Sequence, residues 1–135
     1  MHQSEFSLQT TLGIALHRDL KAIDVVKIPG VTTNDMETGY IWHCLPLVNI
    51  AEFDLSFALC FYRDRLDYIR FSIHNPELYG HGWSDWSEEN EKKRAVHTEK
   101  WLNSIGYSTG SFSWGEIWVG YESKSGFGHG VVRYL

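Results

Sequence analysis

Residues 53–73 constrain the fold of this chain more than any other stretch. Between Phe53 and Phe61 the apolar residues fall on alternate positions, with polar or small residues between most of them. This period of two is typical of a strand with one buried face, because successive side chains of a strand point to opposite faces of the sheet. A second alternating run, residues 68–74, follows the polar turn at residues 63–65. The pattern therefore predicts an antiparallel β-hairpin.

One long helix is expected after this hairpin, at about residues 85–105. Ser84 or Ser87 can accept hydrogen bonds from the free N–H groups of a first turn. Acidic residues come first and basic residues later, as the helix dipole favours, and Gly106 can end the helix in a left-handed conformation. An apolar stripe at three- and four-residue spacing marks the face expected to pack on the sheet. The stripe consists of Ala95, Thr98, Trp101, Leu102 and Ile105.

The first 50 residues predict fewer regular elements. Residues 6–28 fit a strand followed by a short helix, with Asp19 as its cap and Pro29-Gly30 at its end. Residues 30–39 are rich in turn formers and are expected to form a loop. Residues 40–45 fit another strand, which Pro46 would stop because proline has no N–H to give to the ladder.

The C-terminal part of the chain predicts a second β-hairpin. Residues 114–121 alternate, the glycine-rich residues 123–128 fit a turn, and residues 130–135 return as a strand. Residues 74–83 are expected to be a loop, because they contain Asn-Pro and paired glycines. The predicted fold is a single α+β domain over residues 1–135, with an antiparallel sheet of about five to six strands and the helix packed on one face.

Composition narrows the classes of partner. The net charge of −5 disfavours a nucleic acid, because binding to phosphates depends on Lys and Arg, and it matches a basic protein partner better. Six Trp, seven Tyr and seven Phe are more rings than a core of this size hides, so some rings are expected on the surface. No secretory signal precedes the domain, and the longest apolar stretch, residues 57–62, is too short to span a bilayer. A cytoplasmic location without membrane contact is therefore expected.

No motif for catalysis or metal binding is recognisable. The two cysteines, Cys44 and Cys60, each fall inside a predicted strand and are expected to be buried free thiols. His43 and Cys44 are neighbours in one strand and point to opposite faces, so they cannot readily share a metal ion. The sequence predicts no cofactor, no metal and no catalytic residue, and the protein is expected not to be an enzyme.

The sheet face away from the helix is the first candidate binding site. Aromatic and arginine side chains mixed with a few polar groups are enriched at protein interfaces. The residues predicted to lie there are Tyr62, Tyr68, Arg70, His74, Glu116 and Trp118. Several coverings are open at this point: a loop, the N-terminal segment or a second copy of the chain, a partner protein, or a small ligand. An acid–base pair of His74 with Glu116 is a further alternative.

The loop before the helix is the second candidate. It carries Tyr79, His81, Trp83 and Trp86, and loops on a rigid scaffold often carry contacts. The favoured alternative is structural, with Trp83 and Trp86 fastening the start of the helix to the edge of the sheet. Tyr79 and Trp83 are retained as candidate binding residues.

The C-terminal part of the chain, from Trp83 onward, resembles small uncharacterised bacterial single-domain proteins. The resemblance rests above all on Trp114-Gly115-Glu116-Ile117 and on residues 121–126, Tyr-Glu-Ser-Lys-Ser-Gly. Some proteins of that kind are immunity proteins, which bind and block a toxin. The resemblance implies a protein partner and assigns no functional residue.

The leading functional hypothesis is a non-enzymatic protein-binding domain, of the immunity or inhibitor kind, whose partner is a basic protein such as a toxin. The first alternative is a small-molecule or carbohydrate binder that uses Trp118, Tyr62 and Tyr68 as a stacking platform. The second alternative is a homodimer that buries the aromatic face between its subunits.

Overall fold

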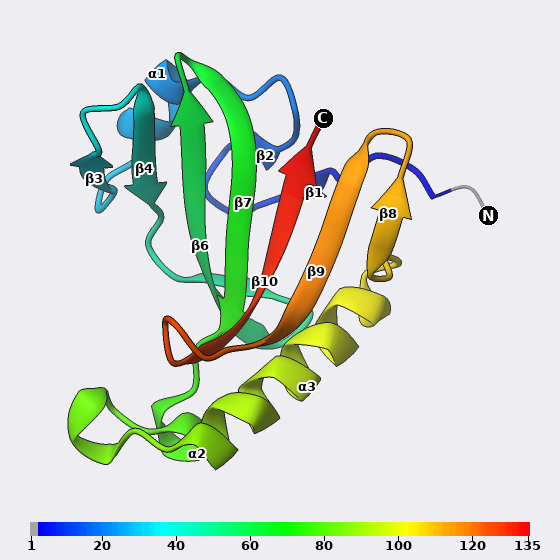
Figure 1. The fold of residues 1–135 in the computed structure, drawn as a ribbon. Helices are drawn as coiled ribbons and strands as arrows, with labels where there is room; N and C mark the ends of the chain where they lie inside the picture. The colour runs from blue at the N-terminus through cyan, green and yellow to red at the C-terminus, as the bar shows by residue number, and fades with distance from the viewer. Residues whose placement is uncertain (1–2) are drawn as a thin grey trace.

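The computed structural model describes residues 3–135 and contains a twisted antiparallel sheet covered on one face by a long helix and the N-terminal segment (Figure 1). The sheet has eight strands in the order β3-β4-β6-β7-β10-β9-β8, with β5 also paired to β6, and β1 and β2 form a separate ladder. The elements are β1 (Leu8–Gln9), β2 (Ala15–Leu16), α1 (Ala22–Val26), β3 (Thr32–Asp35), β4 (Tyr40–Cys44), β5 (Val48–Ile50), β6 (Phe53–Tyr62), β7 (Arg65–Ile73), α2 (Pro76–Tyr79), a 3₁₀ turn (Trp83–Asp85), α3 (Glu88–Ser104), β8 (Gly110–Phe112), β9 (Gly115–Glu122) and β10 (Phe127–Tyr134).

The predicted central hairpin is confirmed as β6 and β7, which pair from Leu55 with Ile73 to Tyr62 with Arg65, with one shift of register between Cys60 and Phe61. The apolar side chains on one face of the hairpin are each at most 2% exposed, so they form the centre of the core. These are Leu55, Phe57, Leu59, Phe61, Ile69, Phe71 and Ile73. Phe53 departs from the expected pattern and is 46% exposed. It directly follows the tight turn at Ala51 and Glu52, both with positive φ, and lies at the rim of the sheet.

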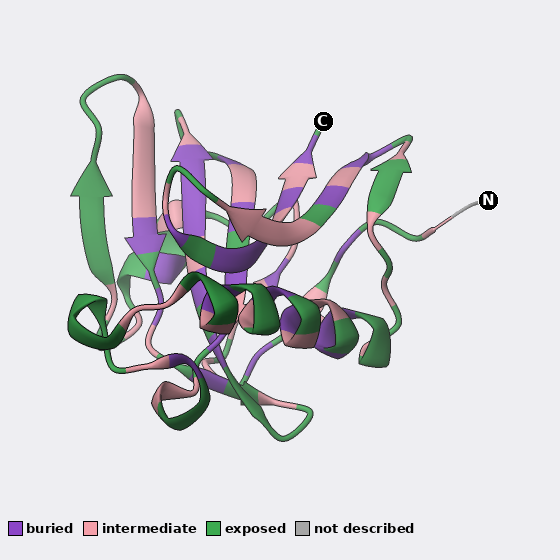
Figure 2. Cartoon of the chain, turned by 60° about the horizontal axis from the view of Figure 1, so that its bottom comes forward, coloured by how far each residue is buried: buried purple, intermediate pink, exposed green. Residues whose placement is uncertain are grey.

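α3 and the N-terminal segment cover the same face of the sheet, which we call the core face. The predicted stripe of α3 packs there, with Trp101 and Leu102 buried against the sheet. Phe6 and Leu16 of the N-terminal segment are fully buried, and the Tyr134 hydroxyl of β10 donates to the Phe6 carbonyl at 2.7 Å. Figure 1 shows the N-terminal segment, with β1, β2 and α1, behind the strands of the large sheet and α3 below them. Figure 2 shows the exposed edge strand β3.

The sequence predicted too few strands, because the missed ones are short or polar. β3 lies inside the expected loop at residues 30–39, and all its residues are exposed, so no apolar alternation marks it. β5 and β8 have three residues each, too few for a period to be read. β10 begins at Phe127 rather than at residue 130, which shortens the turn that precedes it.

The predicted helices need smaller corrections. α3 begins at Glu88, because Trp83–Asp85 forms a separate 3₁₀ turn and the Ser87 side chain accepts from the Asn90 N–H at 3.0 Å. α2 lies within the segment expected to be a loop, with Asn75 as its cap. Asp19 does not cap α1, whose N-cap position is Lys21 and has no side-chain hydrogen bond. None of the helices among residues 3–135 is long and apolar enough to cross a membrane.

The backbone of α3 approaches the backbone of β10 closely at Gly128, near the first turns of the helix. A Cβ atom on Gly128 would overlap the Glu91 carbonyl and crowd the Ala95 nitrogen, both of them backbone atoms of the helix. The Glu91 side chain is 2% exposed, and its Oε1 accepts from the Gly128 N–H at 3.1 Å. Only glycine therefore permits this approach of helix to strand.

We expect Gly128→Ala to lower the free energy of unfolding by about 3 kcal/mol, because the added methyl group must push α3 away from the sheet. Urea denaturation measures the change. Gly120→Ala in the adjacent strand is the matched control: its Cβ would meet only the side chain of Trp118. The control is expected to change stability by less than about 1 kcal/mol. Equal effects of the two substitutions would contradict the close approach at Gly128.

Candidate functional site

The face of the sheet opposite the core face, which we call the outer face, carries the candidate site. Strand register fixes which side chains are neighbours on it. Arg70 of β7, Val131 of β10 and Trp118 of β9 are direct cross-strand partners and form one row. In the next row, Tyr68 is the partner of Arg133, which in turn is the partner of Glu116. Five of the six predicted residues lie on the strands of this face, as the alternation requires.

The predicted residues do not form one compact group. Arg70 and Trp118 share a row, and Tyr68 and Glu116 share the adjacent row. Tyr62 lies at one end of the face, where its ring packs on Tyr40 with centroids 4.6 Å apart.

His74 follows the last residue of β7 at the other end of the face and is exposed. It lies six residues beyond Tyr68 along the chain, roughly 20 Å for an extended strand. Because Tyr68 shares the row of Glu116, His74 and Glu116 are not placed as an acid–base pair.

Arg70 is held in place by a ring that sequence reasoning did not select. Its guanidinium lies over the Trp42 indole of β4, 5.1 Å from the ring centroid. Trp42 and Tyr40 stand on alternate positions of a predicted strand, so the same alternation rule assigns both rings to one face. The order of the strands does not follow from this rule, however, and without that order Trp42 could not be placed near Arg70.

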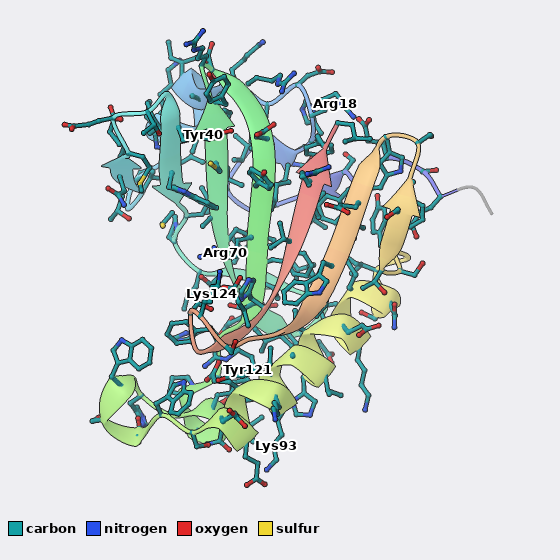
Figure 3. All side chains as sticks on the ribbon, in the orientation of Figure 1. Arg18, Tyr40, Arg70, Lys93, Tyr121 and Lys124 are labelled. Carbon is teal, nitrogen blue, oxygen red and sulfur yellow. The ribbon has the colours of Figure 1, made fainter. Side chains whose placement is uncertain are left out.

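A hollow of about 460 Å³ lies at one end of the outer face, between β7, β10, β9 and the turn that joins β9 to β10. Its lining residues are Arg70, Trp118, Tyr121, Glu122, Ser123, Lys124, His129 and Val131. Figure 3 labels Arg70, Lys124 and Tyr121 close to one another in this region. The sequence predicted only Arg70 and Trp118 of this group, because the turn residues were assigned a purely structural role.

The arginines on the strands of the outer face are unevenly paired. Arg133 lies 3.3 Å from Glu116, and Arg65 lies 3.4 Å from Asp67, so these arginines have carboxylate partners. Arg70 has no ion-pair partner among residues 3–135. The outer face therefore presents an exposed guanidinium whose position is set by an aromatic ring and whose charge is free to meet an anion.

His129 forms part of the floor of the hollow. It is 4% exposed, and its ring packs edge-on against Trp118 with centroids 5.6 Å apart. Burial, assisted by the charge of Arg70, lowers the pKa of His129 below its ordinary value of 6.5. The imidazole is therefore neutral at pH 7 and can both donate and accept a hydrogen bond.

The second candidate, the loop before α3, is built into the fold. Tyr79 is buried, and its hydroxyl lies 2.6 Å from Nδ1 of His97 on α3. The Trp86 indole N–H donates to the Gly126 carbonyl at 2.6 Å, so this ring fastens the start of α3 to the β9–β10 turn. Trp83 is 67% exposed and leans on Phe127, with ring centroids 5.0 Å apart. The structural alternative is confirmed for Trp86.

The cysteines and the described histidines are not arranged as a metal site, and the two thiols differ in exposure. Cys60 is buried, and burial raises the pKa of its thiol to about 11, so the thiolate is scarce at pH 7. Cys44 is exposed, which corrects the expected burial: it lies on the outer face of β4, beside the exposed edge strand β3. Among residues 3–135, no group of three His, Cys, Asp or Glu side chains is placed to hold a metal ion.

We found no match to this chain among protein-family models, curated proteins or solved structures. The resemblance to bacterial immunity proteins therefore stays a prediction.

We expect the free energy of unfolding to fall as the pH is lowered from about 7.5 to about 5.5. His43, like His129, has a pKa lowered by burial from the ordinary value of 6.5, so both are neutral in the folded chain at pH values where the unfolded chain takes up protons. Urea denaturation across this range measures the loss. The double variant His43→Gln, His129→Gln should show a flatter profile, and an unchanged slope would contradict the assignment.

Proposed function

We propose that this chain is a non-enzymatic protein-binding domain whose outer face contacts a partner that presents carboxylates beside apolar side chains. The observation that carries the proposal is that α3 and the N-terminal segment both pack on the core face. Within residues 3–135 neither of them covers the outer face, where Trp118 is 44% exposed and Arg70 is exposed. Aromatic rings and arginine are the side chains that dominate binding energy at protein interfaces.

The charge of the partner follows from where the acidic residues lie. The net charge of −5 belongs to the whole chain, and many of the acidic side chains are on loops and on the first turn of α3. On the outer face, Glu116 is neutralised by Arg133, and the hollow is lined by two cations, Arg70 and Lys124, against one carboxylate, that of Glu122; Arg70 has no ion-pair partner among residues 3–135. An acidic partner surface is therefore complementary to the outer face. The basic partner expected from net charge stays a prediction for the surfaces that carry the acidic residues.

An immunity or inhibitor role is one form of this function. It is supported by the exposed aromatic and arginine side chains of the outer face. It also requires that the bound partner lose its activity.

A tagged form of the chain, used as bait in cells of its source, tests the proposal. The recovered protein would be identified, purified and titrated against the chain by calorimetry. We expect Arg70→Glu to weaken binding at least about tenfold, because it replaces a preorganised cation by an anion at the contact. Recovery of no stoichiometric partner would contradict the proposal.

Lys93→Glu is the matched control, since it makes the same change in charge on the exposed side of α3 (Figure 3). It is expected to change the affinity by less than about twofold, because rim or remote charges contribute little. If Arg70→Glu and Lys93→Glu weaken binding equally, the effect is one of net charge and the outer face is not the contact.

The homodimer alternative makes a different prediction. β7 is the middle strand of the seven-strand order, so two outer faces packed about a two-fold axis would bring the unpaired Arg70 groups toward each other. We therefore expect the chain to sediment as a monomer at micromolar concentration. A stable dimer that Arg70→Glu alters would favour self-association instead.

A further inference from the structure

We propose that the hollow between Arg70, Trp118 and Lys124 is a binding site for an acidic sugar, a pyranose ring that carries one carboxylate. This site goes beyond the proposed protein contact and does not depend on it. It rests on an aromatic platform, two cationic side chains and a set of hydrogen-bonding groups that line the same hollow.

The platform is the indole of Trp118, and Gly120 makes room for it. The two residues lie on the same face of β9, and a Cβ atom on Gly120 would come within 2.8 Å of the indole. The ring therefore lies across the bare backbone of Gly120, with His129 against it on the neighbouring strand, and remains 44% exposed. An indole supported from below in this way can pack its exposed surface on the apolar C–H side of a sugar ring.

The cations are Arg70 and Lys124. Arg70 is positioned by Trp42 rather than by a carboxylate, and Lys124 is exposed on the turn between β9 and β10. Neither has an ion-pair partner among the residues that the structure describes. A carboxylate on the ligand would meet a planar guanidinium from one side and an ammonium from the other.

The remaining polar groups favour hydroxyl groups over additional negative charge. Glu122 lines the hollow and would repel a polyphosphate, but its carboxylate can accept hydrogen bonds from sugar hydroxyls. Ser123 and the neutral His129 can each donate or accept. The volume of about 460 Å³ lies in the range of roughly 300–1,000 Å³ that is typical of small-ligand sites. A singly charged, hydroxyl-rich ring matches this lining best.

Galacturonic acid, a pyranose with one carboxylate, is the probe for a test on the full chain, with neutral galactose as its matched counterpart. Calorimetry and the change in tryptophan fluorescence would follow binding. We expect galacturonic acid to bind and galactose to bind at least about tenfold more weakly, because galactose lacks the carboxylate. A second arm uses the same acidic sugar coupled to a carrier protein, which distinguishes a free sugar from a glycan on a partner.

Two variants test the contributions of the Trp118 platform and of the Lys124 charge separately. Lys124→Met keeps most of the length of the side chain and removes its charge, and Gly120→Ala displaces the indole without removing a polar group. Each is expected to weaken binding of galacturonic acid about tenfold. Lys93→Met on α3 is the control and should leave it unchanged. Trp118→Ala replaces Gly120→Ala if the latter fails to fold, as judged by circular dichroism.

The proposal is overturned by any of three results: no binding of either form of the acidic sugar, equal affinity for galactose, or binding that the variants at Lys124 and Gly120 leave intact. Failure here leaves the protein-partner proposal standing, since that contact is tested by Arg70→Glu with the purified partner.

Discussion

The buried carboxylate of Glu91 is the contact on which much of this structure depends. Its Oε1 accepts from the Gly128 N–H of β10, and Nε of Arg94 lies 3.0 Å from the same oxygen. Arg94 also donates from Nη1 to the Ile73 carbonyl at the end of β7. A buried charge is tolerated only when it is paired and hydrogen-bonded, and here both conditions are met by groups from two strands and one helix. The helix is thereby fastened to the sheet at a defined position.

This attachment also positions the outer face. Glu91 holds Gly128 at the start of β10, and Trp86 donates to the carbonyl of Gly126 at the end of the preceding turn, so the C-terminal end of the turn is tied to the segment around α3. The turn carries Lys124, which lines the hollow together with Arg70. The attachment of α3 on the core face therefore positions a cationic side chain, that of Lys124, at the hollow on the outer face.

The sequence predicted those features of the fold that follow from the local spacing of apolar residues. Alternation in β6 and β7 identified the core, the opposite face and the row that contains Arg70, and the stripe of α3 identified its buried side. It could not predict contacts between distant segments. Glu91 was assigned to the dipole of the first turn, because its bond to Gly128 joins residues 37 positions apart. Lys124 and His129 were missed for the same reason. They become neighbours of Arg70 only through the order of the strands in the sheet, which local periodicity does not predict.

Two glycines of the β9–β10 hairpin allow close contacts, one within the core and one at the candidate site. Gly128 faces the core, where its missing side chain admits the backbone of α3. Gly120 faces outward, where its missing side chain admits the indole of Trp118. Each face of one hairpin thus has a position at which the absence of a Cβ atom allows a close contact. On the core face the contact completes the packing of the domain, and on the outer face it leaves an aromatic surface open to a ligand.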